Sequence, residues 1–263
     1  MQKRRRTLEA KLTEPVLNAQ NVHAAYGKVH ALTGASLQLN TGEICALIGM
    51  NGSGKSTFFK SIMGIVPTSS GSITICGQDS LTARKSGLVG YVPQNEDIDH
   101  HFPLSVEEVV MMGRYCFMGP LRRPKTADKE AVAEAIEAIG LKDLRQRPIG
   151  ALSGGQRKRA FVARALAQGA KLMLLDEPFA GVDYTSEHAI TDLIAELAEQ
   201  NTTLLVSTHD LSAVPKFAHK VALINRRIIK VGEPTETLTP ENLLEAFTES
   251  TARSAQMALG GLA

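Results

Sequence analysis

The chain has 263 residues, with 29 Lys and Arg against 27 Asp and Glu, which leaves a net charge of +2. This length can bury a substantial core as one large α/β unit or two smaller lobes, and the small net charge argues against a surface devoted to nucleic acid. Hydrophobic residues make up 43% of the chain, but no apolar run approaches the roughly 18 residues that a membrane-spanning helix needs. We therefore expect a soluble globular protein, and any membrane spanning would fall to other subunits.

The ends of the chain and the cysteines indicate the compartment. Residues 1–14 contain a basic run with no apolar stretch behind it, so a secretory signal is not expected there. We expect a solvated basic tail, with contact to anionic lipid headgroups as the open alternative, and a flexible tail at 250–263. Cys45, Cys76 and Cys116 are widely spaced without a C-x-x-C pattern, which is typical of reduced thiols. These features together favour the cytoplasm.

The first part of the chain is predicted to be rich in strands. Residues 16–40 alternate apolar and polar side chains on both sides of a turn at Gly27 and Lys28, which predicts two antiparallel strands. The short apolar run 43–48 predicts a strand that leads into a glycine-rich loop, and a helix is expected over 56–63. Two further apolar runs predict strands at 72–76 and 89–92.

Between residues 105 and 166 the pattern changes to helices. Ser105 is a typical helix cap, residues 127–139 repeat apolar side chains at the i, i+3, i+4 spacing, and Leu152 begins another helical region. Strands and helices then alternate again: we expect strands at 172–175, 203–206, 221–225 and 228–231, helices at 186–200 and 211–217, and a short helix within 233–247. This order indicates a helical insertion inside an α/β domain.

Residues 49–57 read GMNGSGKST and fit the pattern G-x-x-x-x-G-K-[ST]. In such a loop, backbone N–H groups surround phosphate oxygens, Lys55 supplies a positive charge and the Ser56 hydroxyl binds Mg²⁺. The alternative is a Gly-rich turn that only precedes a helix. The nucleotide-binding residues expected here are Gly49, Asn51, Gly52, Ser53, Gly54, Lys55, Ser56 and Thr57.

A second anion site is expected where residues 152–156 read LSGGQ. Ser153, Gly154 and Gly155 lie directly before the helical run RKRAFVARALA, so small residues leave the N–H groups of another helix start accessible. Gln156 completes the motif. Two phosphate-binding helix starts in one chain require an explanation.

The pairing of this P-loop with LSGGQ resembles the ATP-binding-cassette (ABC) ATPases. Other short motifs follow in the same order: Tyr26 before the loop, Gln94 in YVPQ, Asp176 and Glu177 after an apolar run, Asp183 in GVD, and His209 in VSTHD. The resemblance covers about residues 15–247. It implies an α/β P-loop NTPase with a RecA-like core, an antiparallel β subdomain and a helical subdomain at about 97–166, all within an ATPase domain of residues 15–249.

The resemblance also implies roles for the motif residues. Asp176 ends an apolar strand, so its carboxylate is expected at the carboxyl edge of a parallel sheet, where it would hold Mg²⁺ through water. Glu177 would be the general base that polarises the attacking water, the alternative being a solvated loop acid. His209 would bond the γ-phosphate and orient this base, and Gln94 would sense both Mg²⁺ and movement of the helical lobe. Tyr26 would stack on adenine, although an aromatic packed on the sheet also fits its position.

The separation of Lys55 from LSGGQ indicates that one chain does not close both motifs around one nucleotide. The resemblance implies a head-to-tail dimer in which ATP lies between the P-loop of one copy and LSGGQ of the other. Ser153 and Gly155 would then act on the partner's nucleotide, with Asp183 at the seam.

Three classes of cassette protein compete for the function. DNA-repair cassettes carry long coiled coils, and no sustained heptads occur here; translation-type cassettes usually join two cassettes, and this chain has one P-loop. The stretch NEDIDHHFPLSVEEVVMMGRYCFMG, followed by LRRP, resembles the ATPase subunits of manganese, zinc and iron ion importers. This favours a subunit at the cytoplasmic face of the cell membrane, bound to separate permease subunits and acting indirectly with an extracytoplasmic metal-binding protein. The alternative is a non-transport cassette acting on DNA or ribosomes.

The segment after Gln94 contains four potential metal ligands, Asp97, Asp99, His100 and His101. Adjacent side chains in an extended segment point to opposite faces, and no second ligand cluster is in view, which argues against a metal site. The favoured interpretation is a groove wall that contacts a helix of a membrane subunit, with Phe102 as its apolar anchor.

Overall fold

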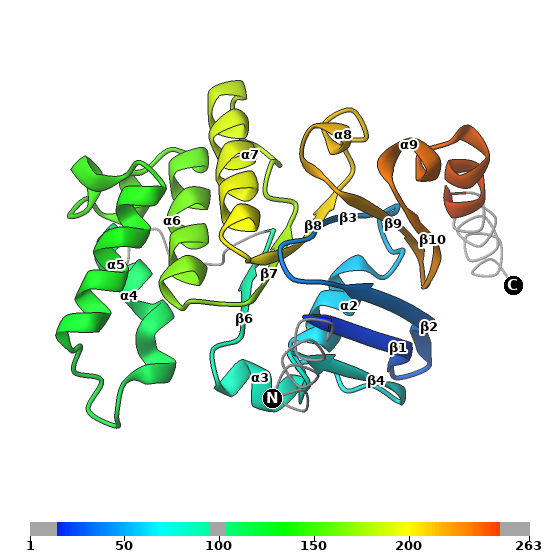
Figure 1. Ribbon diagram of the computed structural model, residues 1–263, viewed down its shortest axis with the longest axis horizontal. Helices are drawn as coiled ribbons and strands as arrows, with labels where there is room; N and C mark the ends of the chain where they lie inside the picture. Colours follow the sequence, from blue (N-terminus) through cyan, green and yellow to red (C-terminus); the bar gives the residue numbers. More distant parts are fainter. Residues whose placement is uncertain (1–14, 95–103, 248–263) are drawn as a thin grey trace, which may run out of the picture.

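The computed structural model describes residues 15–94 and 104–247, and the predicted N-terminal and C-terminal tails lie outside this part (Figure 1). The described strands form two sheets, one of four strands in the order β2-β1-β4-β5 and one of six in the order β10-β9-β3-β8-β7-β6. In Figure 1 a group of helices lies to one side of the larger sheet, while the smaller sheet lies below its opposite half.

The four-stranded sheet is antiparallel, as the alternating pattern predicts. Strand β1 (Leu17–Tyr26) pairs with β2 (Val29–Leu39), and Tyr26 lies opposite Val29 across the turn. Gly27 adopts a φ of 58°, a conformation that glycine reaches without steric cost. Strands β4 (Ser70–Ile75) and β5 (Gln78–Asp79) complete the sheet.

The larger sheet carries the carboxyl ends that form the site. Strand β3 (Ile44–Ile48) lies between β8 (Thr203–Thr208) and β9 (Lys220–Asn225), and β7 (Leu172–Asp176) and β6 (Val89–Val92) follow beyond β8, all in parallel. Strand β10 (Arg227–Gly232) adds an antiparallel edge. Strands β3, β7 and β8 are buried throughout, because both faces of a parallel sheet are covered.

Strand β3 divides the interior into two cores. Ile44, Ala46 and Ile48 belong to the core that includes the helical region, whereas Cys45 and Leu47 face the core formed with helix α2 (Lys55–Ile62) and the antiparallel sheet. This follows from the two-residue period of a strand, which sends neighbouring side chains to opposite faces.

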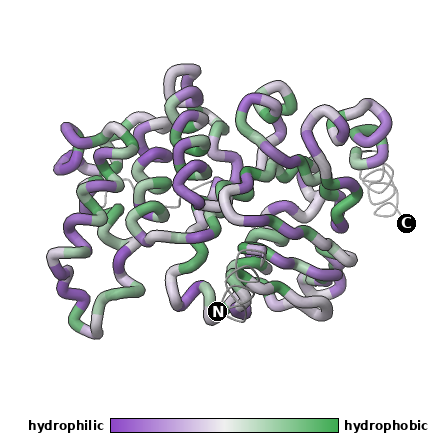
Figure 2. Tube along the Cα trace, in the orientation of Figure 1, coloured by the Kyte–Doolittle hydropathy of each residue, from purple (hydrophilic) through white to green (hydrophobic). Residues whose placement is uncertain are grey.

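All regular elements between Val106 and Ala167 are helical, as the sequence predicts. They are α4 (Val106–Met111), a 3₁₀ turn (Met112–Phe117), α5 (Thr126–Ala138), two further 3₁₀ turns (Lys142–Leu144 and Ile149–Ala151) and α6 (Gly154–Ala167). Ser105 begins α4 with a capping box that it shares with Glu108. Hydrophilic and hydrophobic stretches alternate along these helices in Figure 2, which is typical of helices that bury one face.

The structure departs from the sequence-based expectation in strand β5, which was not expected, and in two helices. Helix α3 (Ser80–Lys85), capped by the Asp79 side chain, was not expected from the sequence. The helix expected at 211–217 begins later, as α8 (Val214–Phe217), because the Asp210 carboxylate accepts hydrogen bonds from the N–H groups of Ser212 and Ala213 and holds the preceding residues in a turn.

Helix α7 (Tyr184–Glu199) packs against the sheet, and two short helical segments end the described chain, α9 (Pro234–Thr237) and residues 240–247. Within the described residues, no helix has both the length and the apolar character needed to cross a bilayer.

Candidate functional site

A cavity of about 540 Å³ lies at the carboxyl ends of β3, β7 and β8. Its walls combine the glycine-rich loop, which follows β3, with side chains at the carboxyl ends of β6, β7 and β8. This is the expected place for a ligand site in an α/β sheet. The lining residues are Ala31, Ile48, Gly49, Met50, Asn51, Gly52, Gly54, Lys55, Ser56, Thr57, Gln94, Asp176, Glu177, His209, Leu211 and Phe247.

The glycine-rich loop depends on its glycines. Gly54, the residue before α2, has a φ of 100°, and a Cβ added there would approach the Ala31 carbonyl oxygen to 2.8 Å. At Gly49 an added Cβ would come within 2.3 Å of the Ile224 carbonyl oxygen. Side chains are therefore excluded where the loop bends, which leaves its backbone facing the cavity.

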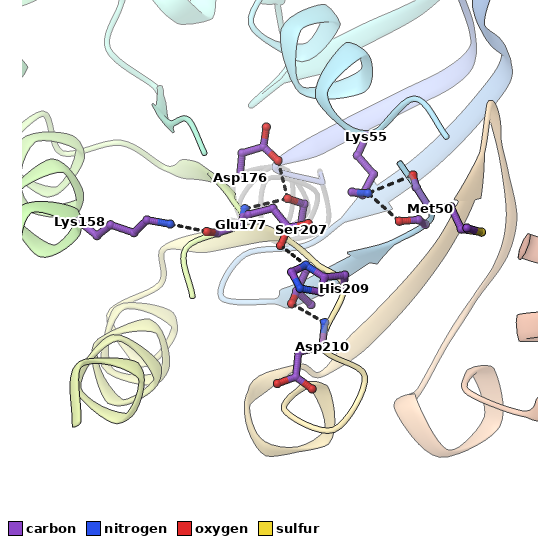
Figure 3. Close-up of polar contacts among 10 residues, drawn as sticks. Met50, Lys55, Lys158, Asp176, Glu177, Ser207, His209 and Asp210 are labelled. Carbon is purple, nitrogen blue, oxygen red and sulfur yellow. Dashed lines mark hydrogen bonds and ion pairs between the residues drawn. The ribbon is translucent and has the colours of Figure 1, made fainter. Parts of the chain in front are cut away.

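Lys55 folds back over this loop. Its Nζ donates to the Gly49 carbonyl oxygen at 2.6 Å and to that of Met50 at 3.3 Å (Figure 3). Burial lowers the pKa of the Lys55 ammonium, while the Asp176 and Glu177 carboxylates oppose this shift. A buried cation beside a helix start that has no side-chain cap is suited to phosphate.

Asp176 is the centre of a small polar network. One carboxylate oxygen, Oδ1, accepts from the Ser207 hydroxyl at 2.5 Å, and the other, Oδ2, accepts from the Ser56 hydroxyl at 3.1 Å. The Tyr91 hydroxyl also lies 3.4 Å from Oδ2. The sequence did not indicate that Ser207 or Tyr91 belongs to the site. For Ser207, the only available signal was a hydroxyl-bearing residue near the end of a fully buried strand.

The residues around Asp176 fit Mg²⁺. The Ser56 hydroxyl and the Asp176 carboxylate present adjacent oxygen atoms, the ligand type that Mg²⁺ prefers, and Mg²⁺ at nucleotide sites takes its remaining ligands from phosphates and water. Among the residues that the structure describes, His, Cys, Asp and Glu form no group of three or more with metal-binding geometry. The four candidate ligands at 97–101 lie outside these residues.

Glu177 has a φ of 52°, a left-handed conformation that is rare for a residue with a side chain. Its N–H lies 2.9 Å from the Ser207 hydroxyl oxygen, and its carbonyl oxygen accepts from Lys158 Nζ at 2.6 Å. Its carboxylate Oε2 lies 2.7 Å from Nδ1 of His209. The Glu177 side chain is buried and the His209 side chain is largely exposed, so the pair extends from the interior to the rim of the cavity.

Outside the LSGGQ motif, two of the predicted nucleotide-binding residues do not line the cavity. Ser53, a residue of the loop itself, is buried, and its hydroxyl has no hydrogen-bond partner among the described residues. Tyr26 is 50% exposed and does not line the cavity, although Ala31 of the paired strand does. Gln94 does line the cavity, and its side chain is exposed. Leu211 and Phe247 line it as well, although the sequence did not indicate them.

The LSGGQ segment is separate from this cavity. Ser153 begins α6 with a capping box that it shares with Gln156. Gly155 packs so closely on the start of α7 that an added Cβ would lie 2.3 Å from the Ser186 hydroxyl oxygen, and Gly154 approaches the Gly181 carbonyl. Of the five LSGGQ residues, none lines the cavity.

These features define a P-loop nucleotide-binding α/β protein with an inserted helical subdomain. A family model described as "ABC transporter" matches residues 32–180. The chain belongs to this family, and it is therefore a nucleotide-binding ATPase subunit.

Curated relatives and solved structures agree with this assignment. The chain is 50% identical over 234 residues to the chelated iron transport system membrane protein YfeB of Yersinia pestis, covering 89% of this chain and 79% of that protein. It is 46% identical over 241 residues to the manganese transport system ATP-binding protein MntA of Synechocystis sp. (strain ATCC 27184 / PCC 6803 / Kazusa), covering 91% and 93%. An inward-facing metal-chelate type ABC transporter has a chain that is 32% identical, with a TM-score of 0.78 and 89% of both chains covered.

Proposed function

We propose that this chain couples ATP binding and hydrolysis to the import of a transition-metal ion, manganese, zinc or iron, through separate membrane subunits. The observation that carries the proposal is the cavity that unites the P-loop with Asp176, Glu177 and His209. Relatives named for chelated iron and manganese transport support the choice of cargo.

The chemistry requires a held phosphate, a metal ion and an activated water. Lys55 and the N–H groups of the loop bind the phosphates. Ser56, Gln94 and, through water, Asp176 would hold Mg²⁺, which would neutralise phosphate charge when bound. Glu177 accepts a proton from the attacking water. His209 orients this carboxylate through its bond of 2.7 Å. Tyr26 stacks on adenine at the edge of the site.

The active form is a head-to-tail dimer of two copies. Support comes from the LSGGQ segment, whose helix start packs on α7 rather than on the cavity of its own chain. A second copy can present Ser153 and Gly155 to the nucleotide, and one two-fold axis then generates two equivalent sites. The proposed ATPase domain spans residues 15–249, with its helical subdomain at about 97–166.

The membrane subunits dock on the side of the helical subdomain. A groove of about 350 Å³ is lined by residues of both this subdomain and the core: Met63, Arg84, Val89, Tyr91, Met112, Gly113, Cys116, Arg164 and Gln168. Tyr115, Phe117 and Leu121 expose apolar surface on the same part of the chain. The predicted contact of residues 97–102 with the membrane subunit, including Phe102, lies outside the described residues. In this arrangement the chain is peripheral, at the cytoplasmic face of the membrane.

Co-purification followed by uptake assays tests the proposal. The tagged chain is isolated from native membrane, and uptake of radioactive manganese, zinc and iron is compared in a deletion strain carrying the parent chain or Glu177→Gln. We expect a multi-spanning subunit in the eluate and loss of uptake of one of these ions with Glu177→Gln. Recovery of DNA or ribosomes, with uptake of all three ions intact, would overturn the transport function in favour of a non-transport cassette.

A further inference from the structure

Lys158 connects the signature helix to the catalytic carboxylate. It lies on α6, the helix that begins at Ser153, and its Nζ donates to the backbone carbonyl oxygen of Glu177 at 2.6 Å. Figure 3 shows the Lys158 side chain extended from its helix toward Glu177. The two residues are 19 positions apart in sequence: Lys158 lies on α6, and Glu177 directly follows β7.

The backbone of Glu177 is held from both sides. Its N–H bonds the hydroxyl and the carbonyl oxygen of Ser207, at 2.9 and 3.2 Å, while its carbonyl bonds Lys158. With a φ of 52°, Glu177 needs such support, because a left-handed conformation in a residue with a side chain persists only where the surroundings impose it. The backbone conformation sets the direction in which the carboxylate leaves the chain.

The position of Lys158 is electrostatically unusual. Its side chain is partly buried, and burying an ammonium group disfavours its charged form unless polar partners compensate. The Glu177 carbonyl and the negative charges of Glu177 and Asp176 provide that compensation. Lys158 is therefore held at the Glu177 carbonyl instead of extending into solvent from the helix.

We propose that Lys158 is a positioning residue that couples contact at LSGGQ to the alignment of Glu177. This rests on the proposed head-to-tail dimer: the partner's nucleotide binds at Ser153, the start of α6, and Lys158, on the same helix, fixes the backbone of the base that acts on its own copy's nucleotide. Two sites of the dimer thereby communicate through one helix.

The alternative is that Lys158 makes a purely structural contact, which only holds the helical subdomain against the core. Loss of a structural contact would lower the stability of the chain without a selective effect on turnover, whereas loss of a positioning contact lowers kcat while ATP still binds. Arg159 offers a matched control, because its Nη1 donates to the Ile139 carbonyl oxygen at 2.9 Å, also from α6, but inside the helical subdomain.

The experiment compares Lys158→Met, Lys158→Arg and Arg159→Met in the full chain. We expect Lys158→Met to lower kcat roughly 10- to 100-fold, the contribution of a hydrogen bond to a charged group, while the affinity for ATP measured in a Glu177→Gln background stays within twofold. Lys158→Arg, which keeps a cationic N–H donor, should recover most of kcat. Arg159→Met should lower the melting temperature with kcat near that of the parent.

The outcomes separate this inference from the proposed function. If Glu177→Gln forms an ATP-dependent dimer and Lys158→Met hydrolyses ATP at the parent rate, only the role of Lys158 is overturned. Equal losses of kcat in Lys158→Met and Arg159→Met would also overturn the positioning role, in favour of a purely structural contact. If Glu177→Gln forms no such dimer, both proposals fail. Should Lys158→Met be poorly folded, Lys158→Leu gives the same comparison, because leucine also lacks a hydrogen-bond donor.

Discussion

Nδ1 of His209 lies 2.7 Å from Oε2 of Glu177, although 32 positions separate the two residues. The contact follows from the register of two parallel strands, since Asp176 at the end of β7 pairs with Ser207 near the end of β8. Residues just beyond the two strand ends therefore meet at the rim of the cavity. A carboxylate held in the interior and an imidazole at the surface form a pair that can reach the same bound nucleotide.

Glu177→Gln should retain ATP binding while steady-state hydrolysis falls by about 10²-fold or more, because an amide cannot accept the proton of the attacking water. The trapped ATP should then hold two copies together. Hydrolysis by the purified chain and size measurement with and without ATP check both results. Near-normal turnover would remove Glu177 from the role of base.

His209→Ala should lower kcat by about 10-fold or more, because the carboxylate loses its contact while its backbone anchors remain. ATP affinity should change little, since the loop and Lys55 are untouched. The control is His219→Ala: Nδ1 of His219 accepts from the Ile44 N–H at 3.1 Å, at the opposite end of β3 from the cavity. A kcat equal to that of the control would contradict a role in orientation.

Ser153→Arg should abolish ATP-dependent dimer formation without preventing ATP from binding each copy. Arginine at this position loses the helix cap and places bulk and charge where the partner's phosphate is expected. The test uses the Glu177→Gln background, in which hydrolysis cannot mask assembly, and measures size by light scattering. A double variant that still dimerises on addition of ATP would show that LSGGQ is not the closing contact.

Ser207→Ala should destabilise the chain by about 1–3 kcal/mol, since it removes a buried hydroxyl that bonds both the Asp176 carboxylate and the Glu177 N–H. The same change should raise the Mg²⁺ concentration needed for half-maximal hydrolysis, because Asp176 loses its fixed orientation. Urea unfolding and Mg²⁺ titrations measure the two effects. Ser212→Ala, which removes an exposed hydroxyl bonded to Asp210, is the control and should leave both quantities unchanged.

Much of the fold was predictable because its signals are local. Three predictions depend only on neighbours a few positions away: the apolar strand β3, the helix that begins in GKST and the cap at Ser105. The structure confirms all three elements. The late start of α8 was missed because the Asp210 side chain competes with the helix for backbone N–H groups, an interaction that periodicity does not report.

The sequence by itself determined the class of protein, the nucleotide loop and the two acidic residues at the end of β7, because each of these is a short run whose chemistry depends on the order of its own residues. The tertiary structure decided which groups surround them. Ser207 and Lys158 reach the Asp176 and Glu177 pair only through strand register and helix packing. Contacts of this kind join residues far apart in the chain, so no local pattern carries them.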